Sequence, residues 1–215
     1  SYSMPASQAW SLIASSDDRF IAVSAGGGAA ALSLNGSFWE STSVPVSGSG
    51  YSMLHNDGRR FILSDWYAYT TSLNGKDWET SKPTTSDSQW CAAATSGDRT
   101  VVVSSSGPAS GIPRVMIFEA LADPFEVILS DVGAIWSDIS HDGNQFIIAG
   151  YDKTMSAPAH YATSIDGESW SYGRLPIVGA RTISSALGVS VVGGSYLGSS
   201  VGCFYDGSSW VSLSI

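Results

Sequence analysis

The side chains that could carry out catalysis are few in this sequence and lie far apart. Hydrolysis of a glycosidic bond needs two carboxylates beside the scissile bond. The segments that we expect to lie innermost (SLIAS, SMLHN, CAAAT, SDISH and ISSAL) offer a single carboxylate, Asp138. The three histidines, His55, His141 and His160, show no spacing typical of metal ligands. We therefore predict that the chain is not an enzyme, has no cofactor and binds no metal.

The elements that must position these side chains form a repeat. The phrase SLNGSFW from Ser33 recurs as SLNGKDW from Ser72, as SIDGESW from Ser164 and, without the serine, as FYDGSSW from Phe204. Each unit opens with a second phrase, an apolar strand followed by a polar turn. In four of the five units this phrase begins with an aromatic residue. The openings lie about forty residues apart, at Trp10, Tyr51, Trp90, Trp136 and Thr182. The chain thus holds five copies of one unit, the third without the Asn-Gly or Asp-Gly turn.

Each unit predicts four short strands, at residues 10–15, 20–25, 29–34 and 38–43 in the first copy. Four strands repeated at this period are typical of propeller blades. We predict an all-β, five-bladed β-propeller with four antiparallel strands per blade, formed by a single domain, 1–215. The start SYSMPASQAWSLI resembles the junction TSVPVSGSGYSML, so we expect the terminal segments to close the ring. The predicted blades are 10–50, 51–89, 90–135, 136–181, and 182–215 together with 1–9.

The recurring Asn/Asp-Gly-x-x-Trp phrase has the residue types of a tight hairpin turn. We expect the Asn or Asp side chain to accept bonds from turn N–H groups, the glycine to take a positive φ, and the tryptophan to fold back over the turn. A Ca²⁺ loop needs several carboxylates, and SLNGSFW has none. We therefore interpret the phrase as a structural turn staple. The staple residues are Asn35, Gly36, Trp39, Asn74, Gly75, Trp78, Asp166, Gly167, Trp170, Asp206, Gly207 and Trp210.

This phrase resembles the Asp-box, or bacterial neuraminidase repeat, of sialidases and other propellers. It is a shortened form, because Asp166 and Gly167 are adjacent where the Asp-box has one more residue between them. The strand-rich repeats, which cover nearly the whole chain, also resemble those of phage tail and other virion proteins. The resemblance implies a propeller fold and, by itself, no activity.

The catalytic residues of sialidases do not carry over to this chain. A sialidase needs an arginine cluster that holds a carboxylate, an acid and a Tyr–Glu pair, on the side opposite the Asp-box turns. Four arginines (Arg19, Arg59, Arg60 and Arg99) fall in turns that we expect on the Asp-box side. The remaining arginines, Arg114, Arg174 and Arg181, have no Tyr–Glu partner.

The connections on the other side of the predicted propeller vary in length and carry aromatic residues. Such loops on a rigid scaffold often hold binding sites. Exposed aromatic rings beside polar groups suit sugar stacking or a protein interface, while the alternative is that half of these rings pack between blades. The candidate binding residues are Trp66, Tyr67, Tyr69, Tyr151, Asp152, His160, Tyr161 and Tyr196.

Composition limits the partners. The net charge of −9 and the scattered basic residues argue against nucleic acid, and no apolar run is long enough for membrane insertion. Cys91 and Cys203 lie in apolar contexts, so we expect two buried thiols. We predict a non-enzymatic binding or structural module of a phage tail or virion protein that contacts a host-surface glycan or protein, or other virion proteins. A soluble glycan-binding lectin is the alternative, and a glycosidase or sialidase-like enzyme the third; we expect a virion or extracellular location.

Overall fold

The structure of the chain is a computed structural model that describes residues 4–5, 8–45, 50–79, 82–83, 89–105, 112–130 and 133–213. Every helix or strand that it assigns in these residues is a β-strand, and they form five four-stranded sheets, each with its strands in chain order. Paired strands are antiparallel throughout. The all-β, five-bladed propeller architecture is therefore confirmed. No helix of the described residues is long and apolar enough to cross a membrane.

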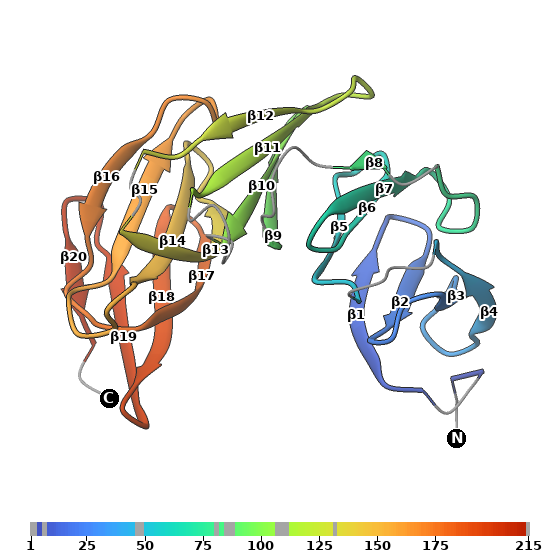
Figure 1. The fold of residues 1–215 in the computed structure, drawn as a ribbon, viewed down its shortest axis with the longest axis horizontal. Helices are drawn as coiled ribbons and strands as arrows, with labels where there is room; N and C mark the ends of the chain where they lie inside the picture. The colour runs from blue at the N-terminus through green and yellow to red at the C-terminus, as the bar shows by residue number, and fades with distance from the viewer. Residues whose placement is uncertain are drawn as a thin grey trace. The chain divides into compact units, whose positions relative to one another are not determined.

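The chain divides into two compact units, Ser1–Trp90 and Cys91–Ile215. The first unit holds sheets one and two (Figure 1). Sheet one consists of β1 (Trp10–Ser15), β2 (Phe20–Ser24), β3 (Ala29–Ser33) and β4 (Glu40–Ser43). Sheet two consists of β5 (Met53–Asn56), β6 (Phe61–Ser64), β7 (Ala68–Ser72) and β8 (Lys82–Pro83). The observed strands of sheet one begin and end within two residues of those expected from the sequence.

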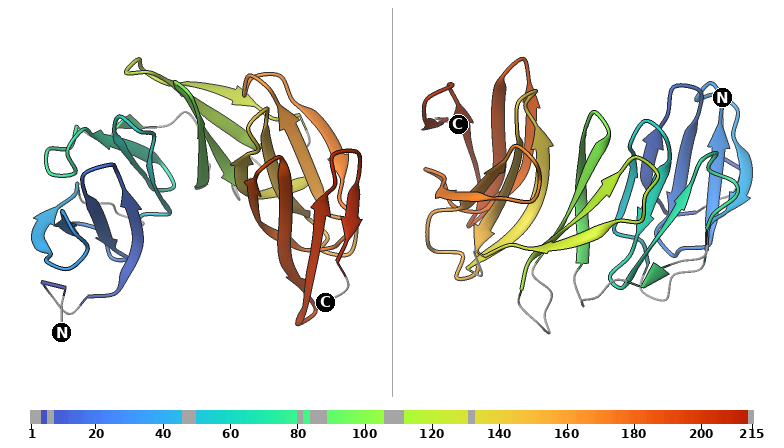
Figure 2. Two further views of the ribbon diagram at one scale, coloured as in Figure 1. Left: turned by 180° about the vertical axis from the view of Figure 1, so that it is seen from behind. Right: turned by 90° about the horizontal axis from the view of Figure 1, so that it is seen from above.

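The second unit holds sheets three to five, and Figure 2 shows the strands of each sheet side by side from two further directions. Sheet three consists of β9 (Gln89–Ser96), which begins in the first unit, β10 (Arg99–Ser105), β11 (Arg114–Glu119) and β12 (Phe125–Ile128). Sheet four consists of β13 (Ala134–His141), β14 (Phe146–Asp152), β15 (His160–Ser164) and β16 (Ser171–Arg174). Sheet five consists of β17 (Ala180–Ala186), β18 (Val189–Tyr196), β19 (Ser199–Tyr205) and β20 (Trp210–Ser212).

Apolar side chains fill the space between consecutive sheets within each unit. In the second unit, Phe146 and Ile148 of β14 belong to a core shared with sheet three, while Ile147 and Ala149 belong to one shared with sheet five. Successive side chains of a strand point to opposite faces. The continuous apolar run FIIAG therefore follows from burial of both faces of sheet four.

Closure of the five sheets into a ring stays a prediction, as does a single domain over 1–215. Residues 1–3, 6, 7, 214 and 215 of the proposed closing segments lie outside the described residues.

Candidate functional site

The turn between the third and fourth strand of sheet one shows the geometry of a staple. The side-chain Oδ1 of Asn35 accepts bonds from the N–H groups of Ser37 at 2.9 Å and Phe38 at 3.0 Å. The indole N–H of Trp39 folds back and donates to the carbonyl of Gly36 at 3.0 Å. The same pair of backbone bonds is accepted by Asn74, Asp166 and Asp206 in sheets two, four and five.

The staple glycines have left-handed backbones and two of them also fit tightly against the preceding sheet. Gly75 has φ +71°, and a Cβ added there would lie 2.9 Å from Cδ2 of Leu32 in sheet one. Gly167 has φ +76°, and its Cβ would lie 2.6 Å from Cγ2 of Val101 in sheet three. Each of these turns therefore packs on the sheet before its own.

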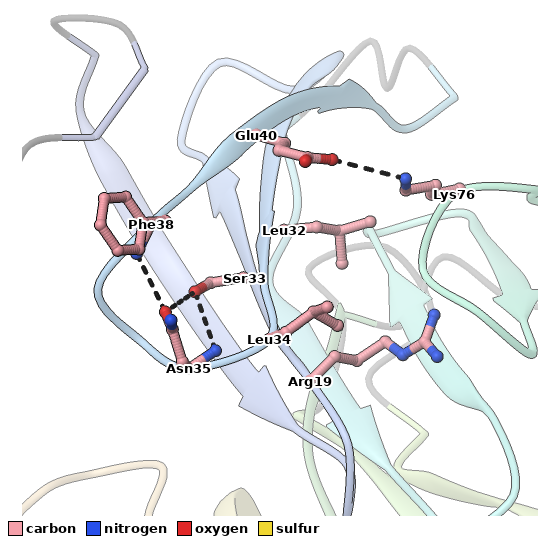
Figure 3. A pocket seen from close by; sticks show the side chains of 8 residues that line it. All are labelled: Arg19, Leu32, Ser33, Leu34, Asn35, Phe38, Glu40 and Lys76. Carbon is pink, nitrogen blue, oxygen red and sulfur yellow. Dashed lines mark hydrogen bonds and ion pairs between the residues drawn. The ribbon is translucent and has the colours of Figure 1, made fainter.

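A pocket of about 240 Å³ lies beside the staple of sheet one. Figure 3 shows Leu32 and Leu34 between the Glu40–Lys76 pair and the side chain of Arg19. Lys76 Nζ lies 3.6 Å from Glu40 Oε2, and Arg19 is bonded to a carboxylate and a carbonyl of its own unit. Both cations are thus engaged within the protein, and the pocket offers a ligand mainly the exposed apolar side chains of Leu34 and Phe38.

Asp138, the carboxylate expected near the axis, links two sheets. Its Oδ2 accepts bonds from Thr182 Oγ1 at 2.8 Å and from the N–H of Ile183 at 2.9 Å, and its Oδ1 accepts one from the N–H of Ile139. This carboxylate is occupied in holding sheet five against sheet four.

The candidate binding residues of the first unit lie around the β6–β7 turn. Tyr67 is 53% exposed, and Trp66 is half-buried. The expectation that Tyr69 is exposed was wrong, because β7 lies inside its sheet and leaves Tyr69 only 8% exposed.

In the second unit, Tyr151 and Tyr196 are half-buried and lie at the ends of two different sheets. The ring of Tyr151 is covered by the guanidinium of Arg181, whose Cζ lies 3.9 Å from the ring centroid. That distance is typical of a cation–π contact, which occupies this face of the tyrosine.

Asp152 and His160 were expected beside exposed rings, and both are buried instead. The β15 strand places His160 in the interior, edge-on to Trp136 with a centroid distance of 6.1 Å. Its Nε2 lies 3.2 Å from Oδ2 of Asp152. Bonds from Thr154 above all, with smaller contributions from His160 and Arg174, hold the pKa of Asp152 well below its usual range. A fixed negative charge therefore lies beneath Arg174.

Arg174 is the exposed member of this cluster. Its Nη1 donates to the carbonyl of Pro158 at 2.9 Å and to Asp152 Oδ2 at 3.3 Å, and it also contacts His160. The side chain is nevertheless 52% exposed, so part of the guanidinium faces solvent.

Arg174 forms one wall of an open groove of about 460 Å³ between sheets four and five, which we call the aromatic groove. Tyr161 and Tyr205 flank Trp210, with ring centroids at 5.6 Å and 5.5 Å. The groove is lined by Pro158, Tyr161, Arg174, Leu175, Pro176, Tyr205, Ser208, Ser209 and Trp210.

The structure thus brings together three of the eight predicted binding residues, with Tyr161 in the groove and Asp152 and His160 behind its arginine. Sequence reasoning missed Arg174 and Tyr205 and treated Trp210 only as a staple. A usable signal was present, because Arg174 is one of three arginines away from the turns expected on the Asp-box side. Among the described residues, no group of three or more His, Cys, Asp or Glu side chains could hold a metal ion.

Comparison with known proteins gives the fold and no family. No protein-family model and no curated protein matches the sequence. Among solved structures, a catalytically inactive virginiamycin B lyase from Staphylococcus aureus with quinupristin is similar, with a TM-score of 0.76 and 7% identity over 97% of this chain and 71% of that one. The WD40 domain of Neurospora crassa Pan2 has a TM-score of 0.69 at 8% identity, over 96% of this chain and 65% of that one. A neuraminidase-like protein of A/flat-faced bat/Peru has a TM-score of 0.62 at 12% identity, over 96% of this chain and 73% of that one.

These likenesses correct one prediction. The chain was expected not to be an enzyme, but virginiamycin B lyase is an enzyme and shares the fold. Propellers of this shape include both enzymes and other proteins, and at such low identity the likeness establishes the fold alone. The single axial carboxylate was therefore insufficient ground for excluding catalysis.

Proposed function

We propose that this chain is a binding module that contacts a glycan or a protein on a host surface, as part of a phage tail or other virion protein. The aromatic groove supports the binding role. Aromatic rings with polar tips provide a large contact area and hydrogen-bonding groups at once, which suits recognition of a partner with mixed polarity. The virion setting rests on the resemblance of the five repeats to those of virion propellers.

The groove also favours a glycan over a flat protein interface. It is concave, it carries three aromatic rings, and Ser208 and Ser209 are exposed within it. A sugar ring presents an apolar C–H face together with hydroxyl groups, and this lining can satisfy both. A soluble lectin would use the same contacts.

The test is a glycan-array screen of the multimerised protein, with whole-cell binding in parallel. Trp210→Ala should weaken binding by about tenfold or more, the loss expected when a buried aromatic contact is removed. Trp170→Ala is the matched control, because Trp170 occupies the same position in the staple of sheet four but does not line the groove.

A second variant separates binding from stability. Ser209→Trp should fill the groove while leaving every core side chain in place, so the thermal midpoint should hold while binding falls. Binding that survives both Trp210→Ala and Ser209→Trp would contradict this location of the site.

A further inference from the structure

Arg174 has an unused hydrogen-bonding edge. Its contacts with Pro158, Asp152 and His160 are all made through Nη1. Neither Nε nor Nη2 donates a bond to any residue that the structure describes. These two N–H groups lie on one edge of the planar guanidinium and point the same way. Such an edge matches the two oxygens of a carboxylate or a sulfate group.

The protein holds this edge in place. Asp152 is fixed by bonds from Thr154, through N–H at 2.9 Å and through Oγ1 at 2.5 Å, and it anchors Arg174 in turn. The carbonyl of Pro158 holds the same nitrogen from a second direction. Because the guanidinium is already oriented, a ligand needs to spend little ordering free energy on it.

The charge of the groove and of the chain limits the type of anion. Arg174 is the one charged residue among those that line the aromatic groove. The chain as a whole carries a net charge of −9, which repels densely charged polyanions such as nucleic acids. The groove therefore suits a ligand with one isolated acidic group next to a ring that can stack.

We propose that the aromatic groove takes an acidic saccharide, with the carboxylate or sulfate on the Nε–Nη2 edge of Arg174 and the sugar ring against Trp210 and its flanking tyrosines. This inference rests on the proposed binding function and names its ligand class. The shared chemistry is a singly charged acidic group on a sugar, either a planar carboxylate or a tetrahedral sulfate. Uronic acids and sulfated sugars both supply it.

The experiment uses pairs of oligosaccharides that differ only at one position, as glucuronate against glucose and sulfated against unsulfated galactose. Wild-type protein should prefer the acidic member by about tenfold or more, as expected for a charged hydrogen-bonded pair. Arg174→Gln should abolish that preference. Arg174→Lys, which keeps the charge but loses the two-pronged edge, should retain only part of it.

Arg181→Gln is the matched control, because it removes the same charge from the same unit at a site outside the groove. Arg181→Gln should leave the preference for the acidic member intact. In the wild-type protein this preference should weaken as the NaCl concentration is raised. The glucuronate and sulfate arms tell which source of the anion the groove accepts.

Each other outcome overturns a defined part of the proposal. If wild-type protein binds acidic and neutral members equally and Trp210→Ala loses this binding, the acidic ligand is rejected and the binding function is kept. An acid preference that persists in Arg174→Gln would reject the role of Arg174. No binding of any member would overturn the acidic-saccharide inference, and a blank on whole cells as well would overturn the binding function.

Discussion

The guanidinium of Arg19 reaches from sheet one to sheet two, where its Nη1 donates to the backbone carbonyl of Asn74 at 2.9 Å. The same bond joins Arg99 of sheet three to the carbonyl of Asp166 in sheet four. In both cases an arginine at the start of the second strand of one sheet, Arg19 directly before β2 and Arg99 as the first residue of β10, binds the staple of the next sheet. The turn phrase and the arginine therefore fasten sheet one to sheet two and sheet three to sheet four.

Removal of this fastening should weaken the first unit. Arg19→Gln should lower the free energy of unfolding by about 1 kcal/mol, the usual contribution of one hydrogen bond of this kind. Arg19→Lys should be nearly as destabilising, because a single ammonium lacks the fork that binds Asp18 and Asn74 together. Urea unfolding followed by tryptophan fluorescence measures both, and full stability of Arg19→Gln would show that the bond contributes nothing.

The staple glycines should differ in their tolerance of alanine. Gly167→Ala combines a left-handed backbone with a Cβ 2.6 Å from Val101, whereas the Cβ of Gly207→Ala meets nothing within 4 Å. Backbone strain should cost about 1 kcal/mol at both positions, and overpacking about 2 kcal/mol more at Gly167. The comparison of the two melting curves isolates packing from backbone strain. Equal destabilisation would mean that the contact between sheets relaxes freely.

Cys91 should be replaceable by serine. Its thiol lies near the carbonyls of Val103 and Trp136, at 3.4 Å and 3.8 Å, as Ser137 lies near two carbonyls at 3.2 Å in sheet four. Cys91→Ser should change the free energy of unfolding by about 0.5 kcal/mol or less, and Cys91→Ala should lower it by about 1 kcal/mol. Greater damage from serine than from alanine would contradict the equivalence.

The folded state should also protect this thiol from alkylation. Burial raises the pKa of Cys91 to about 12, so almost no thiolate is present at pH 8. The rate of iodoacetamide labelling in native buffer and in urea measures the protection. Native labelling as fast as that of the unfolded chain would contradict it.

Acid should lower the stability that the aspartate-containing staples contribute. A bond from the N–H group of Ser169 lowers the pKa of Asp166 below the usual 3.8. Bonds from the N–H group of Ser209 and then from the hydroxyl of Ser208 do the same for the pKa of Asp206. A carboxyl with a lowered folded pKa stabilises the protein above its unfolded pKa, and this stability is lost as the pH falls below about 4. The double variant Asp166→Asn, Asp206→Asn should therefore lose less of its thermal midpoint than wild type between pH 6 and pH 3.

The converse substitution serves as the control for this prediction. Asn35→Asp places a carboxylate in a staple that has none, with the same two N–H donors available. It should make the first unit more sensitive to acid. Identical pH profiles for all three proteins would mean that the staple carboxylates do not titrate differently in the folded state.

The repeat made most of the fold predictable. Strand positions follow from short apolar segments between turns of fixed type, and the tryptophan and glycine of each staple are recognisable without any knowledge of distant contacts. Burial on both faces of β14 is equally visible in the run FIIAG. These features are local, so a single unit of the sequence contains them.

The aromatic groove was not predictable for the opposite reason. Tyr161 and Trp210 belong to different repeats and meet only when sheet five packs on sheet four. Nothing local distinguishes the outward side chain of Tyr161 from the inward one of His160, since which of two neighbours faces the core depends on the register of β15 against β14. Sequence placed both residues in one exposed loop, and the sheet separates them.

The contact of Gly75 with Leu32 has a direction along the chain, from a later turn to an earlier sheet. During synthesis the amino-terminal sheet leaves the ribosome first, before the turn that covers it exists. The part of the sheet-one surface at Leu32 therefore stays uncovered by this turn until residue 75 has emerged, and the part of the sheet-three surface at Val101 until residue 167 has emerged. At these two places an earlier sheet depends on a later turn for its cover, and apolar surface that waits in this way during synthesis is the kind that chaperones bind.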